Sequence, residues 1–217
     1  MSFLESHLLS VLIFGPLLAA AIAAVLATVA PGDKLQRLWA LISTTALAAA
    51  SLPLWTRFVA GSHDFQFVEN LSWIPSLKIN YTVGVDGIAV LLVLLTTLIS
   101  PLCVLASWTY IQKRVAEFMI ALLVMEAAMV GVFCALDTVL FFIFWEAMLI
   151  PMCLMIGVWG GPRRIYASLK FFIYTMAGSV FLLVSIIAMR MQTGSFSIPE
   201  TMGHPFSHGF QTWIFLA

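Results

Sequence analysis

Residues 141–152 read FFIFWEAMLIPM and place a single carboxylate, Glu146, inside an otherwise apolar run. A charged side chain near the centre of a bilayer is costly, so such a residue is usually paired, protonated or functional. Pro151 lacks an N–H, so the carbonyl of Ala147 loses its helical partner and the helix is expected to kink there. A buried acid beside a free carbonyl is a place where a water or a proton can stop. The structural alternative is a kinked membrane helix with a hydrogen-bonded glutamate.

The composition is that of a polytopic membrane protein. Of the 217 residues, 62% are hydrophobic and only 9% are charged, and the mean hydropathy is +1.07. A soluble domain could not cover its surface with so few polar residues. The formal net charge of zero gives no indication of a nucleic-acid or acidic partner. The three cysteines show no metal-ligand spacing, and His204 and His208, although four residues apart, are separated by Pro205 in a predicted loop, so neither a metal site nor a disulfide is expected.

Six segments are long and apolar enough to cross a bilayer, which takes about 20 residues in a helix. They are expected at 8–29, 38–59, 88–111, 115–136, 139–159 and 167–189. A seventh apolar run starts near Phe210 and continues to Ala217 without a polar flank, so the sequence is expected to be a fragment. The expected fold class is all-α, with six full transmembrane helices and the start of a seventh. The longest connection, 61–85, shows partial alternation that predicts a short hairpin on the membrane surface.

The distribution of basic residues predicts the orientation. Seven of the ten Lys and Arg residues fall in or beside the connections after the first, third and fifth spans: Lys34, Arg37, Lys113, Arg114, Arg163, Arg164 and Lys170. The positive-inside rule therefore places these connections in the cytoplasm and the N-terminus on the periplasmic side. We expect a multi-pass protein of the bacterial inner membrane. The mitochondrial inner membrane is less favoured, since no targeting features are recognisable.

Two glutamates share one depth in the predicted bundle. The fourth and fifth spans meet in a tight turn near Leu136, and Glu126 and Glu146 each lie ten residues from it. At about 1.5 Å per residue both lie about 15 Å from the turn, roughly halfway across the hydrocarbon core. If they face each other, repulsion and desolvation would favour the protonated form of at least one. Equal depth does not fix the face, so Glu126 pointing at another helix is an equal alternative.

The remaining charged residues near the spans have a local interpretation. Lys170 lies about two turns into the sixth span, where it either extends back to the cytoplasmic interface or points inward and sets the charge of Glu146. Asp137, in the outer turn, is placed to cap the fifth span, and Asp86 to cap the third. We interpret both aspartates as structural.

These residues carry a resemblance to a known family. The segments that match are GVDGI at 84–88, GVFCALD at 131–137, FWEAMLIPM at 144–152 and KFFIYT at 170–175. Together they resemble the antiporter-like M subunit (chain 4) of respiratory complex I, the proton-translocating NADH:quinone oxidoreductase. The resemblance covers the chain from about residue 81 onward. Mrp-type sodium/proton antiporter subunits share the general plan, but the GVDGI and FWEAMLIPM motifs favour complex I.

The resemblance implies a fold and a role. The family has about fourteen membrane helices with inverted repeats and broken helices. Residues 1–114 would form the first three helices with the 61–85 surface loop, and 115–217 the first part of the proton-channel repeat. Such a subunit is part of a translocase but does no redox chemistry. No cofactor is expected in this chain, because NADH, FMN, iron–sulfur clusters and quinone belong to other subunits. Its partners would be those membrane subunits, including neighbouring antiporter-like ones, and the lipid bilayer.

The family's proton-handling glutamate falls on Glu146, and its partner lysine is expected beyond Ala217. The hypothesis is that Glu146 takes up and releases a proton, while Lys170 and Glu126 relay protons or tune Glu146. Two alternatives stay open. One is a subunit of an Mrp-type sodium/proton antiporter. The other is a non-transporting membrane scaffold in which Glu146 only stabilises the fold.

Overall fold

The computed structural model describes residues 7–30, 32–62 and 64–216, so Ala217 lies outside the described residues. Six helices in this part are long and apolar enough to span a membrane, as the sequence predicts. Their bounds are α2 Leu8–Val29, α3 Asp33–Arg57, α4 Gly87–Tyr110, α5 Val115–Cys134, α6 Thr138–Trp159 and α7 Arg164–Thr193. Two short helices follow, α8 Ile198–Met202 and α9 His208–Leu216. The protein is therefore an integral membrane protein with the expected predominantly helical fold.

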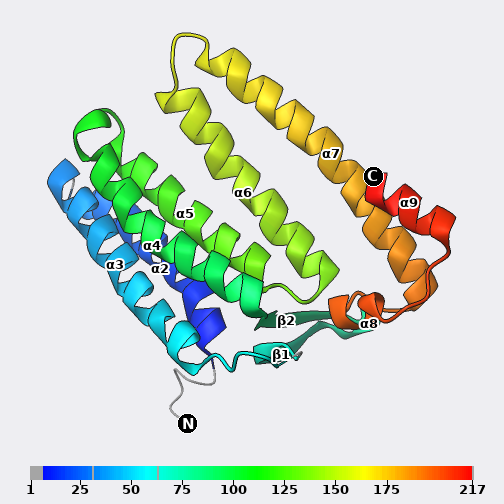
Figure 1. The fold of residues 1–217 in the computed structure, drawn as a ribbon. Helices are drawn as coiled ribbons and strands as arrows, with labels where there is room; N and C mark the ends of the chain where they lie inside the picture. The colour runs from blue at the N-terminus through cyan, green and yellow to red at the C-terminus, as the bar shows by residue number, and fades with distance from the viewer. Residues whose placement is uncertain (1–6, 31, 63, 217) are drawn as a thin grey trace.

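The connection between α3 and α4 contains the two β-strands of the described residues. Strands β1 Gln66–Ile74 and β2 Ile79–Val85 pair antiparallel, joined by the short 3₁₀ helix η1 Pro75–Leu77. Lys78, in the left-handed conformation with φ of 56°, completes the tight turn. The hairpin that the alternation predicts is confirmed. It lies across one end of the helix bundle (Figure 1), and we call this end the hairpin end.

The helices form two parts that differ in packing. Helices α2 to α5 lie together as a compact group, with α6 beside α5 and α7 on the far side of α6 (Figure 1). A buried cluster at the hairpin end joins α2, α3, α4, α5, α6 and β2; it includes Leu9, Ile13, Leu54, Val83, Val90, Val130 and Leu140. A second cluster lies toward the opposite end and contains Ala40, Val104, Ile111, Val115, Met119 and Leu122.

The turn between α5 and α6 is fixed by backbone hydrogen bonds on both sides. The N–H of Leu136 donates to Thr82 O in β2 at 2.9 Å, and the N–H of Ile198 donates to Leu136 O at 2.9 Å. The N–H of Thr138 donates to Phe196 O, also at 2.9 Å. The turn therefore lies between the hairpin and the segment before α8. This bonding fixes the point from which α6, and with it Glu146, starts.

Helix α7 is longer than the sequence analysis predicts. It begins at Arg164 and ends at Thr193, where Gly194 adopts a φ of 79°. The sequence analysis placed its ends at 167 and 189, because polar and basic residues there interrupt the apolar run. Those residues, which include Arg164, Arg190 and Gln192, continue the helix beyond its apolar middle, since Arg and Gln are good helix formers.

Candidate functional site

The two glutamates lie at the same depth, as predicted. Glu126 is eight residues before the last residue of α5, and Glu146 is eight residues after the first residue of α6. The helices run antiparallel from a common turn (Figure 1), so both carboxyls lie about 12 Å from their helix ends at the hairpin. Depth alone therefore does not distinguish them, and the distinction comes from the faces they occupy.

Glu146 faces away from α5. A Cβ added to Gly131 on α5 would meet the ring of Phe144 on α6 at 2.5 Å, so these two positions mark the contact between the helices. At about 100° per residue, Glu146 lies about 160° around α6 from Phe144. By the same count, Glu126 lies about 140° around α5 from Gly131. Neither glutamate is on the face through which α5 and α6 touch.

Glu146 instead shares a face with the residues that contact α7. Cys153 is seven residues further along α6, two turns away on the same face. Its Sγ lies 2.9 Å from Ser168 Oγ on α7, and the Ser168 hydroxyl donates to Cys153 O at 2.8 Å. Gly157, one turn beyond Cys153, allows the two helices to approach closely, because a Cβ added at this position would lie 3.2 Å from Ser168 Oγ. The face of α6 that carries Glu146 is therefore the one that packs on α7.

The buried residues of α7 are mostly polar. Moving seven residues from the Ser168–Cys153 contact toward the hairpin end brings Thr175 of α7 to the level of Glu146. The buried residues of α7 in the described chain are Ser168, Ser179, Ser185 and Ile186, so three of the four are serines. Many apolar side chains of α7, such as Ile173, Val180 and Ile187, are instead exposed. We call this contact between α6 and α7 the polar seam.

Glu146 has an unsatisfied atom in this seam. The residue is half-buried, and its Oε1 is fully buried without a hydrogen-bond partner in the described structure. Thr175 donates its hydroxyl to Phe171 O at 2.7 Å, which leaves its oxygen free to accept. A buried carboxyl oxygen without a hydrogen bond is unfavourable unless it is protonated, bound to a water or able to reach a mobile partner. The polar seam therefore carries the titratable Glu146 on α6 and the hydroxyl of Thr175 at the same level on α7.

Glu126 lies in different surroundings. It is 1% exposed, and neither carboxyl oxygen has a hydrogen-bond partner in the described residues. Its polar neighbours, Ser100 and Cys103, belong to α4. The Ser100 hydroxyl is nevertheless outside hydrogen-bonding geometry and donates to Thr96 O at 2.9 Å. Of the two alternatives, Glu126 facing another helix is the one observed, although without a bond there.

Lys170 does not approach Glu146 in this structure. It lies two residues after Ser168, so it projects from nearly the opposite side of α7. Its side chain is exposed, and its Nζ lies 5.9 Å from the centre of the Tyr166 ring. No ion pair among the described residues joins Lys170 to either glutamate. The outward alternative is thus the one the structure supports.

The proline and the two aspartates occupy local structural positions. Helix α6 runs continuously from Thr138 to Trp159 with Pro151 inside it. Asp86 Oδ1 accepts the N–H of Ala89 at 2.7 Å at the start of α4. Asp137 Oδ1 accepts the N–H groups of Val139 and Leu140 at 2.9 and 3.2 Å. These positions match the caps that the sequence predicts.

Asp137 has a second function in the fold. Its Oδ2 accepts the N–H of Asn80 at 3.2 Å, which ties the start of α6 to β2. Burial raises the pKa of the Asp137 carboxyl, and the hydrogen bonds from Asn80, Leu140 and Val139 oppose that rise. The carboxyl is 2% exposed, so a helix cap and a hairpin anchor are combined in one buried side chain.

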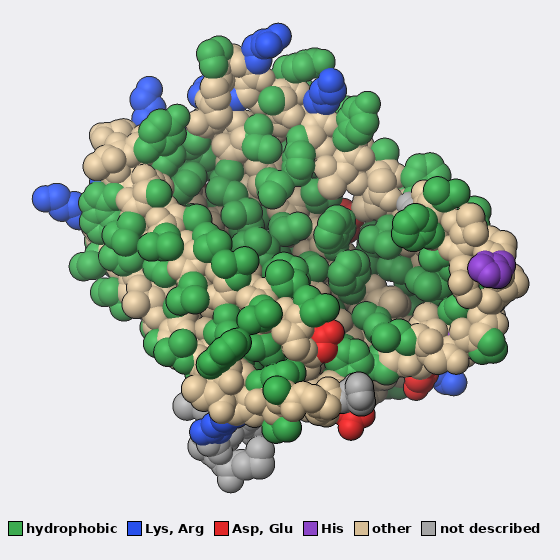
Figure 2. Space-filling model, viewed as in Figure 1, with side chains coloured by type: hydrophobic (Ala, Val, Ile, Leu, Met, Phe, Trp, Pro, Cys, Tyr) green, Lys and Arg blue, Asp and Glu red, His purple; other side chains and the backbone are tan. Residues whose placement is uncertain are grey.

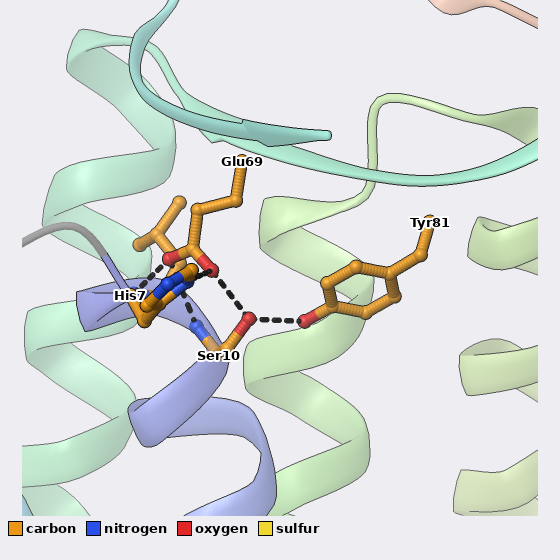
Figure 3. Close-up of polar contacts among 5 residues, drawn as sticks. His7, Ser10, Glu69 and Tyr81 are labelled. Atoms are coloured by element: carbon orange, nitrogen blue, oxygen red, sulfur yellow. Dashed lines mark hydrogen bonds and ion pairs between the residues drawn. The ribbon is translucent and has the colours of Figure 1, made fainter. Parts of the chain in front are cut away.

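A polar cluster that the sequence analysis missed holds the N-terminus of α2 (Figure 3). Glu69 of β1 accepts the N–H groups of Leu9 and Ser10 at 2.9 and 3.2 Å, and also the Ser10 hydroxyl. His7 Nδ1 lies 3.5 Å from Glu69 Oε2. Ser10 Oγ and the Tyr81 hydroxyl are 3.0 Å apart. Burial is the main cause that raises the pKa of Tyr81 to about 12. Glu69 thus caps a helix to which it is not adjacent in sequence.

Two known protein families together match the chain from residue 34 onward. Residues 34–132 match the family described as NADH-ubiquinone oxidoreductase chain 4, amino terminus. Residues 135–217 match the family described as NADH:quinone oxidoreductase/Mrp antiporter, TM. The two matches meet at the end of α5, so the glutamates lie in different family regions.

Curated relatives carry consistent names. Subunit M of the NADH-quinone oxidoreductase of Rhodobacter capsulatus is 45% identical, over 97% of this chain and 44% of that protein. Chain 4 of the NADH-ubiquinone oxidoreductase of Arabidopsis thaliana is 40% identical, over 85% of this chain and 37% of that protein. The chain therefore spans less than half the length of these relatives.

Solved structures share the fold. A chain of respiratory complex I from Thermus thermophilus with bound NADH matches with a TM-score of 0.78 and 25% identity, over 94% of this chain and 42% of that chain. A chain of the Mrp complex from Dietzia sp. DQ12-45-1b matches with a TM-score of 0.81 and 20% identity, over 96% and 22%. The Mrp likeness, at that identity, concerns the fold alone.

Proposed function

The chain belongs to the subunit M (chain 4) family of NADH:quinone oxidoreductases, and from this membership we propose that it forms part of a proton-translocating membrane subunit with Glu146 as the proton-carrying side chain. The observation that carries the proposal is the position of Glu146. It lies at mid-depth in the polar seam, with a buried carboxyl oxygen that has no hydrogen-bond partner among the described residues. An ionisable residue inside a membrane helix marks an ion pathway more often than a packing site.

The surroundings of Glu146 support proton exchange more than permanent pairing. At the level of Glu146 on α7 lies Thr175, whose hydroxyl donates to Phe171 O and whose oxygen can still accept a hydrogen bond. Among the described residues, Glu146 has no ion pair that would fix it in one charged state. In our proposal, Glu146 takes up and releases a proton as charges elsewhere in the complex change.

Glu126 and Lys170 have secondary roles in this proposal. Glu126 faces α4, and Lys170 lies on the outer side of α7, so neither contacts the Glu146 carboxyl directly. Their charges still act on Glu146 through the low-dielectric interior, where unit charges interact over longer distances than in water. Replacing them should alter the rate of proton transfer less than replacing Glu146.

The subunit would function within a larger assembly. We place it in the bacterial inner membrane with its N-terminus and hairpin on the periplasmic side, following the distribution of basic residues. The partners would be other membrane subunits of complex I, including antiporter-like neighbours. NADH, FMN, iron–sulfur clusters and quinone are assigned to those other subunits, which makes this chain a transport component of the enzyme.

The test is Glu146→Gln in the full-length protein within its native complex, because the amide keeps the shape but cannot carry the proton. We expect the complex to assemble and NADH-driven proton translocation, followed with a pH-sensitive dye in vesicles, to be lost. Glu146→Asp, which keeps the carboxyl, should retain part of the activity. Normal translocation by an assembled Glu146→Gln complex would refute the assignment, and failed assembly of that variant alone would favour the scaffold alternative.

The Mrp-type antiporter is the second candidate, because a chain of an Mrp complex shares the fold. The same vesicles separate the two. Sodium-dependent proton exchange that continues without NADH oxidation would favour the antiporter. Proton translocation that requires NADH and is unaffected by sodium would favour the complex I subunit.

A further inference from the structure

Basic side chains gather at the end of the bundle opposite the hairpin. Figure 2 shows several Lys and Arg side chains around this end of the molecule. Between the α4–α5 connection and the α6–α7 turn lies a groove of about 530 Å³. Its charged lining residues are Lys113, Arg114 and Arg164, and no acidic side chain lines it. We call it the basic groove.

The floor of the basic groove is built by contacts between helices that are distant in sequence. Trp159 at the end of α6 donates its indole N–H to Lys113 O at 2.7 Å, and its ring packs edge-on against Phe118 at 5.2 Å. Arg37 of α3 donates to the carbonyl of Ile111, a lining residue, at 2.8 Å. The groove is therefore shaped by interhelical bonds and is more than a chance gathering of flexible surface cations.

The charge in the groove is only partly balanced. Arg114 pairs with Glu117, three residues along α5. No ion pair in the described residues involves Lys113 or Arg164, and the buried Nε of Arg37 has no hydrogen-bond acceptor there. Cations collected without a matching acid favour an anionic ligand, and phosphate is a common partner of Arg and Lys.

The position of the basic groove indicates which kind of anion it would bind. The groove lies at the ends of four helices that are long and apolar enough to span a membrane. The ends of such helices are expected at the level of the lipid headgroups. Trp159 and Tyr110 are among its lining residues, and such aromatic side chains favour the headgroup region. Basic pockets between membrane helices at this level bind phospholipid headgroups.

An apolar track continues from the groove along α7. Ile165 lines the groove and is 66% exposed, and Leu169 and Ile173 follow at one-turn intervals with 55% and 64% exposure. Residues four apart lie above one another on one helix face. A phosphate in the groove would therefore have its acyl chain aligned with an exposed apolar stripe of the same helix.

We propose that the basic groove binds the phosphate headgroup of an anionic phospholipid, with Lys113 and Arg164 as the principal cations and an acyl chain along the Ile165–Leu169–Ile173 stripe. The lipid would link the α4–α5 connection to the α6–α7 turn. This binding site is independent of proton transport by Glu146.

The experiment uses the full-length protein, purified in detergent, stripped of lipid and titrated with phosphatidylglycerol, with bound lipid counted by native mass spectrometry. Lys113→Gln/Arg164→Gln should weaken binding about tenfold or more, since each cation near the headgroups contributes on the order of 1 kcal/mol. The matched control, Lys78→Gln/Arg190→Gln, removes two charges at the hairpin end and should leave the affinity within about twofold. Lys113→Arg/Arg164→Lys keeps both charges and should keep binding.

Three results would overturn the proposal. Equal affinity in the groove variant and the hairpin-end control would show that total charge alone matters. Binding of phosphatidylcholine as tightly as phosphatidylglycerol would exclude recognition of a net anion. Displacement of the lipid by inorganic phosphate at matched concentrations would identify a site for soluble phosphate instead.

Discussion

Helices α5 and α7 carry the two intramembrane environments of this protein, and they are packed in opposite ways. In α5, 56% of the apolar window is buried inside the structure, whereas in α7 the share is 17%. Glu126 is enclosed by the closely packed α2–α5 group, while Glu146 faces a helix whose buried residues are mostly serines. Two carboxyls at one depth thus differ in access and in neighbours, and we propose proton exchange for the less enclosed one.

The largest expected effect on stability concerns the anchor of the packed part. Glu69→Ala removes the acceptor of the Leu9 and Ser10 N–H groups, so we expect the free energy of unfolding to fall by about 2–4 kcal/mol. Denaturant titration of the full-length protein in micelles measures this change. Glu117→Ala, which breaks the exposed pair with Arg114, is the matched control and should change little. Equal effects would show that the hairpin is not an anchor of the packed group.

The α5–α6 contact should tolerate no added methyl. In Gly131→Ala the new Cβ meets the Phe144 ring, so we expect a loss of about 1–3 kcal/mol from overpacking. Gly178→Ala on α7 has no atom within 4 Å of the added Cβ. That control should be neutral or stabilising by about 0.5–1 kcal/mol, because alanine favours a helix more than glycine does. Equal melting temperatures for the two variants would contradict the difference in packing between the α5–α6 contact and α7.

The polar seam should be held weakly. Ser168→Ala removes the hydrogen bond to Cys153 O, and interhelical bonds of this kind in membranes contribute on average about 0.6 kcal/mol. Ser43→Ala is the control, since the Ser43 hydroxyl bonds only to carbonyls of its own helix, those of Trp39 and Ala40. Thermal unfolding of both variants checks the expectation. A loss of several kcal/mol in Ser168→Ala would make the seam a rigid contact and contradict the comparison.

The smallest expected effect on stability comes from the ionisation of Tyr81 in the hairpin. Burial raises the pKa of Tyr81 from 10.0 to about 12, so the stability linked to its neutral form is present below pH 10.0 and is lost as the pH rises toward 12. Tyrosinate absorbance should show one of the four tyrosines ionising late. In Tyr81→Phe this late component should be missing. A titration curve identical to that of the unmodified protein would place Tyr81 in an exposed position.

Much of the fold follows from periodicity and caps. Six apolar runs of spanning length gave the helices, and Asp86 and Asp137 marked two of their starts because aspartate accepts the first N–H groups of a helix. The shared depth of Glu126 and Glu146 followed from counting residues from the turn. These features are local, so a single sequence contains them.

The faces of the helices required the structure. Whether Glu126 points at α4 or α6 depends on the rotation of α5, which is set by contacts such as Gly131 with Phe144. Glu69 gave no local signal, because the helix it caps lies about 60 residues earlier in the chain. The sequence does contain the pattern of Ser168, Thr175 and Ser179, because spacings of seven and four residues place these side chains on one helix face.

The central claim is that Glu146, and not Glu126, carries the proton. The most direct test measures protons translocated per NADH oxidised by vesicles containing the assembled complex with Glu146→Gln or with Glu126→Gln. We predict that the Glu146 variant loses NADH-driven proton translocation, while the Glu126 variant keeps most of the unmodified ratio of protons to NADH. Equal losses in both variants, or a larger loss in Glu126→Gln, would contradict the account.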